Sequence, residues 1–370
     1  MTLPYDDITQ AVLGNDDVAR HVRDAGSRGR LRGYLDELRT TQRHRIYRAL
    51  QHPLYPILRR IERIAEDVEH ARAAAAAGRV VYVSNHKSHV DYLIEPLLMD
   101  DHGIRQPLIA AGINLFGGPL GLLHRHVTGA IPIRRSTGDP VYLAALKTYV
   151  AEVLKRRDLL YYGEGGRSYS GELKAPKTGL LQAALQANHA SLSVVPMAIA
   201  YDIVLEEKLL ARAATVGRKR PFSREVPEMV RHAIGYRSRA FVTFGAPIPL
   251  SEYDPAARRD VVALAHRIQH EVGLLHKVLP TALVAAALRA SMTRSELAAR
   301  IDDLLALFSV QQANLAVTSG RQAVDEGVER LVNRGVLMTE HQRVQVRDRM
   351  VLEYYARTLE HLMPLRRSTP

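Results

Sequence analysis

The 370-residue chain contains no cysteine and no tryptophan. The absence of cysteine excludes thiol nucleophiles, thiolate zinc sites and structural disulfides, and it fits a reducing compartment. No uninterrupted apolar run reaches the roughly 18 residues that a membrane-spanning helix needs. The first ten residues include acidic side chains and lack the positive-then-apolar pattern of a secretory signal. We therefore expect neither a spanning helix nor a secretory leader.

The longest nearly apolar stretch is Pro107–Leu123, which is interrupted by Asn114 and by a Gly117-Gly118-Pro119 breaker. We interpret it as a loop-containing element of the buried core. An element that dips into one face of a membrane is the alternative.

Positive charge is in excess, with 51 Lys and Arg against 39 Asp and Glu, a formal net charge of +12. Such a protein attracts polyanions, which include nucleic acid, anionic lipid, phosphorylated metabolites and acidic carrier proteins. Charge alone does not choose among them.

The apolar fraction of 46% supplies a sizeable core, and the length suggests two or three packing units. Residues 1–78 are polar with helical apolar spacing at Ile57, Ile61, Ile64 and Val68, which predicts a helical N-terminal unit. Short β-type runs then alternate with helical segments; they contain Val80–Val83, Ile131 with Ile133, Leu159–Tyr162, Val194 with Val195, and Phe241–Phe244. This alternation predicts an α/β fold with a mixed, largely parallel central sheet covered by helices.

We place this α/β domain at residues 79–278 and a helical C-terminal region at 279–370. One helix of the domain has clear start signals, because Asp139 can cap it and Pro140 suits its first position. Its apolar stripe contains Tyr142, Ala145, Leu146, Tyr149, Val150 and Val153. The basic segment Arg212–Arg224 is rich in breakers and predicts an exposed loop.

The first residues able to do chemistry follow the strand that ends near Val83, in the stretch SNHKSHVDY. His86 and Asp91 are five residues apart, about 140° around a continuous helix, so they meet only if His86 lies in the loop that enters a helix and Asp91 lies in its first turns. In that geometry Asp91 fixes the imidazole tautomer and leaves the other ring nitrogen as a base. A capping pair without catalytic function, or a metal site that adds His89, are the alternatives.

Two further motifs carry cationic groups. A strand-like stretch ends in Arg134 and Arg135, which face opposite sides if the strand continues through them. Later, the turn Gly163–Ser168 supplies Gly165, Gly166 and Arg167, and Lys177 follows just before a helix expected to start near Thr178. Flexible glycines, exposed peptide N–H groups and cationic side chains are typical of a phosphate site.

The turn Gly163–Ser168 matches neither a Walker A loop nor a dinucleotide-binding fingerprint. The chain also lacks a GxSxG nucleophile elbow, because Ser170 stands where glycine would be required.

Taken in order, four blocks resemble those of the glycerolipid acyltransferases: NHKSHVDYL (85–93), GAIPIRRS (129–136), YYGEGGRSYSGELKAPKTG (161–179) and VVPMAIAYDIVLE (194–206). The later segments FGAPIPLSEY, PTALVAAAL and LEYYARTLEHLM are similar to those of the glycerol-3-phosphate acyltransferases, the bacterial membrane-associated type with mitochondrial and dihydroxyacetone-phosphate relatives. The resemblance extends from about residue 80 to the end. The chain departs from it at Pro132, where many relatives have an aromatic residue, and in its shortness.

The resemblance implies that His86 removes the proton from the sn-1 hydroxyl of glycerol 3-phosphate as this oxygen attacks an acyl thioester, with Asp91 orienting the imidazole. It implies substrate-binding roles for six residues: Arg134, Arg135, Arg167 and Lys177 at the acceptor phosphate, and Glu164 and Gly165 in shaping the loop. The expected donor is acyl-CoA or an acylated carrier protein, and no metal or organic cofactor is expected.

The same resemblance leaves dihydroxyacetone phosphate or a lysophospholipid open as the acceptor. A catalytically inert lipid-binding relative is disfavoured because His86, Asp91, Glu164 and Arg167 are all present. Non-specific nucleic-acid binding is a remote alternative, because aromatic residues do not interleave with the basic clusters. A lipid product and the net charge predict peripheral attachment to an anionic membrane surface, on the cytoplasmic side of the cell membrane.

Overall fold

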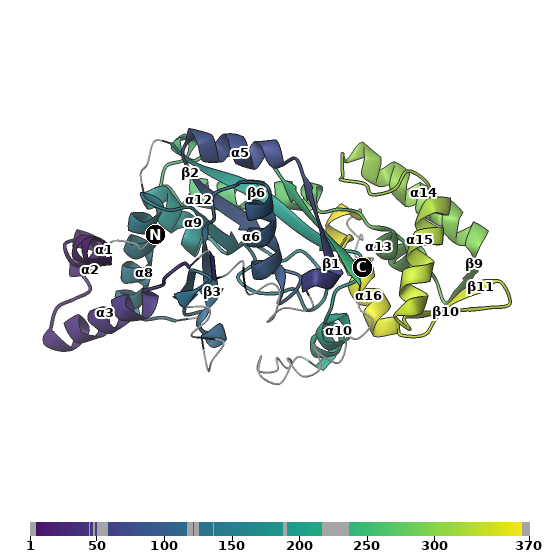
Figure 1. The fold of residues 1–370 in the computed structure, drawn as a ribbon, viewed down its shortest axis with the longest axis horizontal. Helices are drawn as coiled ribbons and strands as arrows, with labels where there is room; N and C mark the ends of the chain where they lie inside the picture. The colour runs from purple at the N-terminus through teal and green to yellow at the C-terminus, as the bar shows by residue number, and fades with distance from the viewer. Residues whose placement is uncertain are drawn as a thin grey trace, which may run out of the picture.

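The computed structural model describes residues 5–43, 45–46, 49, 58–116, 121, 126–135, 137–187, 191–216 and 237–364. Its centre is an eight-stranded sheet in the order β1-β7-β6-β2-β5-β3-β4, with β8 paired to β6 (Figure 1). The strands are β1 (Ile61–Glu66), β2 (Arg79–Ser84), β3 (Leu108–Gly112), β4 (Ala130–Ile133), β5 (Leu159–Tyr162), β6 (Leu192–Tyr201), β7 (Ser238–Phe244) and β8 (Ile248–Pro249). Only β7 and β8 run antiparallel to their neighbour β6; the other pairs are parallel. The predicted mixed, largely parallel α/β fold is confirmed.

Helices cover both faces of this sheet. Val80 and Tyr82 of β2 pack in one apolar cluster with α5 (Val68–Ala77) and α6 (Asp91–Asp101). Val81 and Val83 point to the opposite face, toward α8 (Pro140–Leu154), α9 (Gly179–Gln186) and α12 (Arg258–Leu275). Burial on both faces explains why β2 is a continuous apolar run rather than an alternating one.

The predicted start and stripe of α8 are confirmed. The Asp139 carboxylate accepts a 2.9 Å hydrogen bond from the N–H of Val141, and Pro140 occupies the first turn. All six residues of the predicted stripe are buried. A helix also begins directly after Thr178, as expected.

The N-terminal helices α1 (Tyr5–Leu13), α2 (Asp16–Ala19) and α3 (Ala25–Leu38) pack on α8. The helical prediction for residues 1–78 is wrong at Ile61–Glu66, which form an edge strand parallel to β7. The prediction for Pro107–Leu123 missed β3, although Leu108 and Ile109 are buried as expected. Residues 117–120 and 122–123 of that stretch lie outside the described part of the chain.

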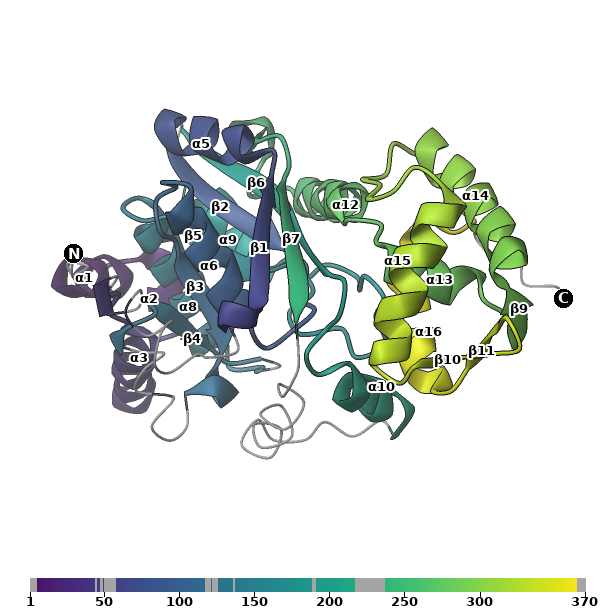
Figure 2. The same ribbon diagram turned by 45° about the vertical axis from the view of Figure 1, so that its right-hand side comes forward.

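The C-terminal region lies beyond β7 and α12, on the far side from β3 and β4 (Figure 2). Its helices are α13 (Pro280–Ala287), α14 (Arg294–Val310), α15 (Gly320–Asn333) and α16 (Arg349–Arg357). The prediction of a helical C-terminal region is incomplete, because β9 (Ser291–Thr293), β10 (Leu337–Glu340) and β11 (Arg343–Val346) form a three-stranded antiparallel sheet.

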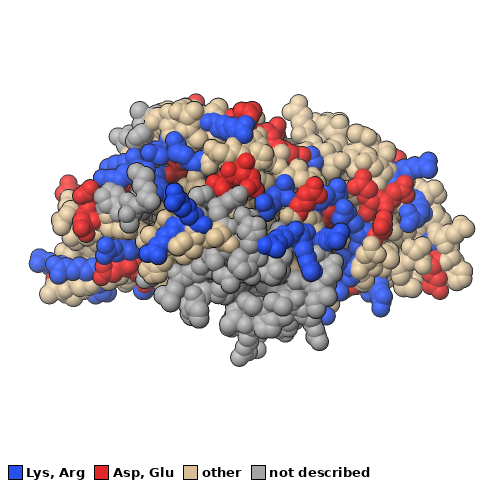
Figure 3. Space-filling view, viewed as in Figure 1, with Lys and Arg blue, Asp and Glu red and all other residues tan. Residues whose placement is uncertain are grey.

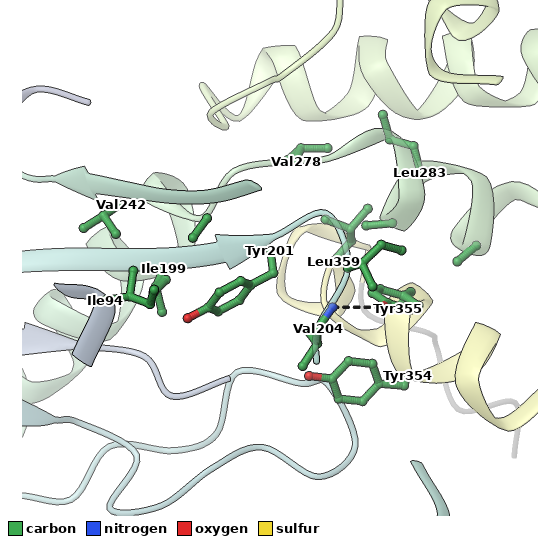
Figure 4. Packing of buried hydrophobic residues seen from close by; sticks show 14 of the residues in the cluster. Ile94, Ile199, Tyr201, Val204, Val242, Val278, Leu283, Tyr354, Tyr355 and Leu359 are labelled. Atoms are coloured by element: carbon green, nitrogen blue, oxygen red, sulfur yellow. Dashed lines mark hydrogen bonds between the residues drawn. The ribbon is translucent and has the colours of Figure 1, made fainter. Parts of the chain in front are cut away.

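Helix α16 joins this region to the central sheet. Tyr354, Tyr355 and Leu359 pack beside Val204, just after the end of β6 (Figure 4). The N–H of Val204 donates a 3.0 Å hydrogen bond to the Tyr355 hydroxyl. The C-terminal region is therefore part of the same core as the end of β6.

Helix α10 (Glu207–Val216) follows β6. Arg212 to Val216 of the predicted exposed loop belong to this helix, and residues 217–224 lie outside the described part of the chain. Among the described residues, no helix is both long and apolar enough to cross a lipid bilayer.

Candidate active site

The candidate site lies at the edge of the sheet where the parallel strands β2, β4, β5 and β6 end. Strand β2 ends at Ser84, a loop carries His86, and α6 begins at Asp91. This is the geometry that the five-residue spacing requires. The chain reaches it because the loop between strand and helix turns both side chains toward each other.

His86 and Asp91 form a buried pair. The imidazole Nδ1 lies 2.8 Å from Oδ2 of Asp91, and the two residues are 8% and 0% exposed. The same Oδ2 accepts the N–H groups of Lys87 at 2.7 Å and Ser88 at 2.8 Å. The Asp91 carboxylate therefore both fixes the loop and faces the imidazole.

Tyr201, at the end of β6, completes the surroundings of this carboxylate. Its hydroxyl donates a 2.6 Å hydrogen bond to Oδ1 of Asp91. Asp91 thus faces four donors, and each of them favours the ionised carboxylate.

Burial and nearby cations set the protonation of the pair. Burial lowers the pKa of His86 well below its ordinary value, and the charges of Arg167, His89 and Arg135 lower it further. Burial raises the pKa of Asp91 to about 6, against the opposing effect of its hydrogen bonds. At neutral pH the pair is a neutral imidazole beside a carboxylate, with Nδ1–H donating to Asp91 and the Nε2 lone pair left for a substrate.

The imidazole ring is held by stacking. Tyr162, at the end of β5, stacks on His86 with ring centroids 4.0 Å apart and planes 10° from parallel. The Tyr162 hydroxyl donates to Glu95 at 2.9 Å, and Ser84 donates to the same carboxyl group at 2.5 Å. The ends of β2 and β5, tied to Glu95 of α6, thereby fix the plane of the ring.

Glu164 joins the loop of His86 to the glycine-rich turn. One of its buried carboxylate oxygens accepts the N–H of His86 at 3.0 Å and the other accepts the N–H of Lys174 at 3.1 Å. The N–H of Ser168 donates to the His86 carbonyl at 3.0 Å. These contacts explain a loop-shaping role for Glu164, while its negative charge does not suit direct contact with a phosphate.

Arg167 enters the same space from the glycine-rich turn. It is 9% exposed, and its guanidinium lies 3.4 Å from Glu206 and 3.3 Å from the Tyr169 hydroxyl. Glu206 in turn accepts the Ser88 hydroxyl at 2.8 Å and the N–H of His89 at 2.7 Å. Glu206 therefore positions Arg167 beside the His86 loop.

The adjacent arginines at the end of β4 separate, as the strand alternation predicts. Arg134 points away from the cluster, toward α3, where it makes a two-pronged ion pair with Glu37 at 2.8 and 2.6 Å and lies over Tyr34. The structure does not bring Arg134 to the site. The prediction that Arg134 contacts the acceptor phosphate is therefore corrected, because its guanidinium is paired with Glu37 of α3.

Arg135 packs against two glycines beside the site. A Cβ atom added to Gly112 would lie 2.9 Å from the centre of the Arg135 guanidinium, and one added to Gly166 would lie 3.3 Å from its Nη1. The absence of a side chain at Gly166 thus leaves space for Arg135 next to Arg167. Burial and the charge of Arg167 lower the pKa of Arg135.

Lys177 and Gly165 meet at the rim of the turn. Gly165 has a φ of +67°, a left-handed conformation that favours glycine, and an added Cβ would lie 3.0 Å from Cγ of Lys177. The N–H of Lys177 donates to the Gly163 carbonyl at 2.8 Å. Lys177 is exposed and closes the turn through its backbone.

Sequence reasoning did not single out four residues that position this site: Lys87, Tyr162, Tyr201 and Glu206. Tyr201 and Glu206 belong to a block that carries the family resemblance, but their contacts cross 110 and 117 residues, and no local spacing reveals them. The buried ammonium of Lys87 donates to the Gly171 carbonyl at 2.7 Å, which adds a further link between the two loops.

Two known family models match the chain, one in each half. Residues 63–200, which include His86, Asp91, Arg135 and Arg167, match the family model described as acyltransferase. Residues 229–366 match the model of the glycerol-3-phosphate acyltransferase C-terminal region. The chain belongs to the glycerol-3-phosphate acyltransferase family.

Individual members of this family show the extent of the similarity. The glycerol-3-phosphate acyltransferase of Glaesserella parasuis serovar 5 is 28% identical over 90% of this chain and 46% of its own length. That of Pseudoalteromonas atlantica is 33% identical over 68% of this chain and 33% of its own, and that of Pasteurella multocida 37% identical over 51% and 24%. The chain thus matches about a quarter to a half of the length of these relatives.

A solved structure is more distant. The crystal structure of the 1-acyl-sn-glycerophosphate acyltransferase from Thermotoga maritima shares 14% identity and a TM-score of 0.36, over 56% of this chain and 69% of that chain. This similarity is too low to support a residue-by-residue comparison.

Proposed function

We propose that this protein transfers a fatty acyl group from a thioester donor to the sn-1 hydroxyl of glycerol 3-phosphate. The observation that carries the proposal is the placement of a His86–Asp91 pair and of Arg135 and Arg167 around one end of the sheet. A base and two cations side by side suit a small substrate that has a hydroxyl at one end and a phosphate at the other. Family membership supports the same reaction.

His86 is the proposed base. As the hydroxyl oxygen of glycerol 3-phosphate bonds to the thioester carbonyl carbon, its proton passes to Nε2 of His86. The tetrahedral intermediate then collapses, the carbon–sulfur bond breaks, and the imidazolium returns the proton to the leaving thiolate. Asp91 stabilises the imidazolium through Nδ1–H, and such a positioned base contributes about 10² to 10⁴ in rate.

Arg135 and Arg167 are the proposed contacts of the acceptor phosphate. Guanidinium groups donate paired hydrogen bonds to phosphate oxygens, and charge-assisted bonds of this kind are about twice as strong as neutral ones. Packing against Gly166 and pairing with Glu206 hold the two groups in place before substrate arrives. Lys177, at the rim, adds positive charge on the approach to the turn.

The donor in this proposal is acyl-CoA or an acylated carrier protein. We further propose that the protein works at an anionic membrane surface, on the cytoplasmic side of the cell membrane, because its product is a lipid and its net charge is +12. Flotation with anionic vesicles at low salt tests the attachment. Protein that stays in solution under these conditions contradicts it.

An acceptor panel tests the reaction and the substrate together. Thiol release from one long-chain acyl-CoA is followed with glycerol 3-phosphate, dihydroxyacetone phosphate, a lysophospholipid or no acceptor. The proposal predicts release that depends on glycerol 3-phosphate and is fastest with it. Release that requires another acceptor, or no release with any of them, contradicts the proposed function.

A further inference from the structure

A groove rich in arginine opens near the beginning of β1 and β7. It has a volume of about 1210 Å³ including its open mouth, and it is lined by Arg59, Arg60, Glu62, Arg237, Ser238, Arg239 and Arg330. We call it the arginine groove. Five guanidinium groups in one concavity make a binding place for an anion with several charges.

Two of these arginines are held by a buried carboxylate. Oδ2 of Asp202 lies 2.9 Å from Nε of Arg239 and 2.9 Å from a terminal nitrogen of Arg330, and Asp202 is 0% exposed. The Ser238 hydroxyl donates to Oδ1 of Asp202 at 2.7 Å. The arginine side chains remain 28% and 33% exposed, so the buried Asp202 orients both guanidinium groups while part of each side chain reaches solvent.

The lining of the groove is mostly basic. It contains five arginines and one carboxylate, Glu62, while Asp202 and Glu326 contact Arg239 from beside the groove, the latter at 3.5 Å. Arg237 is exposed and makes no ion pair with any described residue. Figure 3 shows basic side chains gathered over this end of β1.

The arginine groove and the His86–Asp91 pair lie at the same edge of the sheet. Strand β6 is parallel to β2, so both end at this edge. Strand β7 is antiparallel to β6 and β1 is parallel to β7, so both begin there, and Ile61 is in register with Ser238. Arg60 directly precedes β1 and Arg237 directly precedes β7. The two residues therefore lie side by side at the edge that carries the site.

The separation along this edge fits one class of molecule. From β2 to β1 there are three strand spacings, about 14 Å across the sheet. The register also places Ser238 about six residues further along β6 than Ser84, which adds roughly 20 Å along the strands. In a coenzyme A thioester the acyl carbonyl is separated by an extended pantetheine arm from a diphosphate and a 3′-phosphate. The extended arm together with the nucleotide has a length of this order, and the three phosphates match a concave cluster of guanidinium groups.

We propose that the arginine groove binds the phosphates at the nucleotide end of a coenzyme A thioester while the acyl carbonyl lies at His86. The inference rests on the proposed function and names its donor class. A carrier protein is favoured less, because it presents its carboxylates on a convex surface and only one phosphodiester. Anionic lipid headgroups are the competing occupant that the test must separate.

Arg60→Ala with Arg237→Ala is the double variant to test, because it leaves the buried Asp202 paired. Its KM for a long-chain acyl-CoA should rise about tenfold or more, since two charge-assisted contacts are lost. Its KM for glycerol 3-phosphate, and its kcat/KM with the same acyl group on pantetheine, which has no nucleotide phosphates, should stay within about twofold. Arg259→Ala, a 93% exposed arginine of α12, is the matched control and should change neither. An unchanged KM for acyl-CoA, or an equal loss with acyl-pantetheine, overturns the proposal.

A binding measurement separates this proposal from the proposed function. Adenosine 3′,5′-bisphosphate, titrated calorimetrically without acceptor, should bind the unmodified protein, compete with acyl-CoA, and bind the double variant at least tenfold more weakly. Equal binding to both proteins overturns the inference even if acyl transfer is observed. Loss of binding to anionic vesicles together with unchanged nucleotide binding assigns the groove to the membrane instead. If the nucleotide binds as expected but no acceptor is acylated, the proposed function is contradicted and the assignment of the groove is not.

Discussion

The hydroxyl of Tyr201 donates a 2.6 Å hydrogen bond to Oδ1 of Asp91, while the imidazole of His86 faces Oδ2 of the same carboxylate. Tyr201 lies at the end of a strand 110 residues further along the chain, so the tertiary fold, and not the local motif, completes the pair. The Tyr201 hydroxyl on Oδ1 and the three donors on Oδ2 together fix the plane of the carboxylate and hence the direction of the imidazole. Tyr201 is thus a positioning residue for the proposed base.

Tyr201→Phe should lower kcat/KM about tenfold and move the acid limb of its pH profile to higher pH. Without the hydrogen bond from Tyr201 the ionised carboxylate of Asp91 is less stable, which raises the pKa values of the coupled pair. Since His86 must be neutral to act as a base, activity is then lost at a higher pH as the medium is acidified. The measurement is kcat/KM for the acceptor between pH 5 and 8.

Tyr355→Phe is the matched control for that experiment. Its hydroxyl accepts the N–H of Val204 close to the same strand end but does not touch Asp91. It should lower stability and leave the acid limb where it is. The positioning role of Tyr201 is refuted by an acid limb that does not move in Tyr201→Phe.

Alanine substitutions at Arg134 and Arg135, the two arginines that follow β4, should have different effects on acceptor binding. Arg135→Ala should raise the KM for glycerol 3-phosphate about tenfold to a hundredfold, because a charge-assisted contact to the phosphate is lost. Arg134→Ala should leave that KM unchanged and cost about 1 kcal/mol of stability or less, because its ion pair with Glu37 is 41% exposed on the arginine side. Steady-state kinetics and urea unfolding of both variants decide. A raised KM in Arg134→Ala alone would reverse the assignment.

His361 makes the fold sensitive to acid. Its Nε2–H donates to the Gly273 carbonyl at 2.9 Å, and burial together with the charges of Lys87 and His270 lowers its pKa to about 4. Between its ordinary value near 6.5 and this value the unfolded chain binds the proton and the folded chain does not, so stability falls as the pH falls through that window. From pH 7 to pH 5 the loss due to this group is about 2 kcal/mol at most.

His361→Gln should remove this part of the acid destabilisation, because glutamine keeps a donor for Gly273 and has no proton to gain. The measurement is the free energy of unfolding in urea at pH 7 and pH 5, for the variant and for the unmodified protein. His341→Gln, at a side chain that is 88% exposed, should change nothing. An unaltered difference between the two pH values in His361→Gln would contradict the prediction.

The regular parts of the fold could be predicted from local patterns, and the exceptions have physical reasons. Strand β2 and helix α8 carry their signals within a few residues. Ile61, Ile64 and Val68 have helical spacing, yet Ile61–Glu66 form a strand because β7, more than 170 residues away, supplies their hydrogen-bond partners. The short strand β9 likewise pairs with β11 some 50 residues later, and the hairpin of β10 and β11 completes that sheet.

The candidate site divides in the same way. The spacing of His86 and Asp91 predicted a loop-to-helix geometry that the structure shows, and alternation at the end of β4 predicted that Arg134 and Arg135 would separate. Which of the two would face the site depends on α3 and Glu37, far earlier in the chain, so no local pattern could decide it. The catalytic and substrate-binding roles remain predictions.

Thiol release by His86→Ala tests the central claim most directly. With one long-chain acyl-CoA and saturating glycerol 3-phosphate, the variant should release thiol at least about a hundredfold more slowly than the unmodified protein, since the proposed base is removed. Because the substitution also removes a buried ring that stacks on Tyr162 and faces Asp91, the unfolding transition of the variant is measured to establish that it is folded under the assay conditions. Thiol release at the unmodified rate, dependent on glycerol 3-phosphate, by a folded His86→Ala protein would contradict the account.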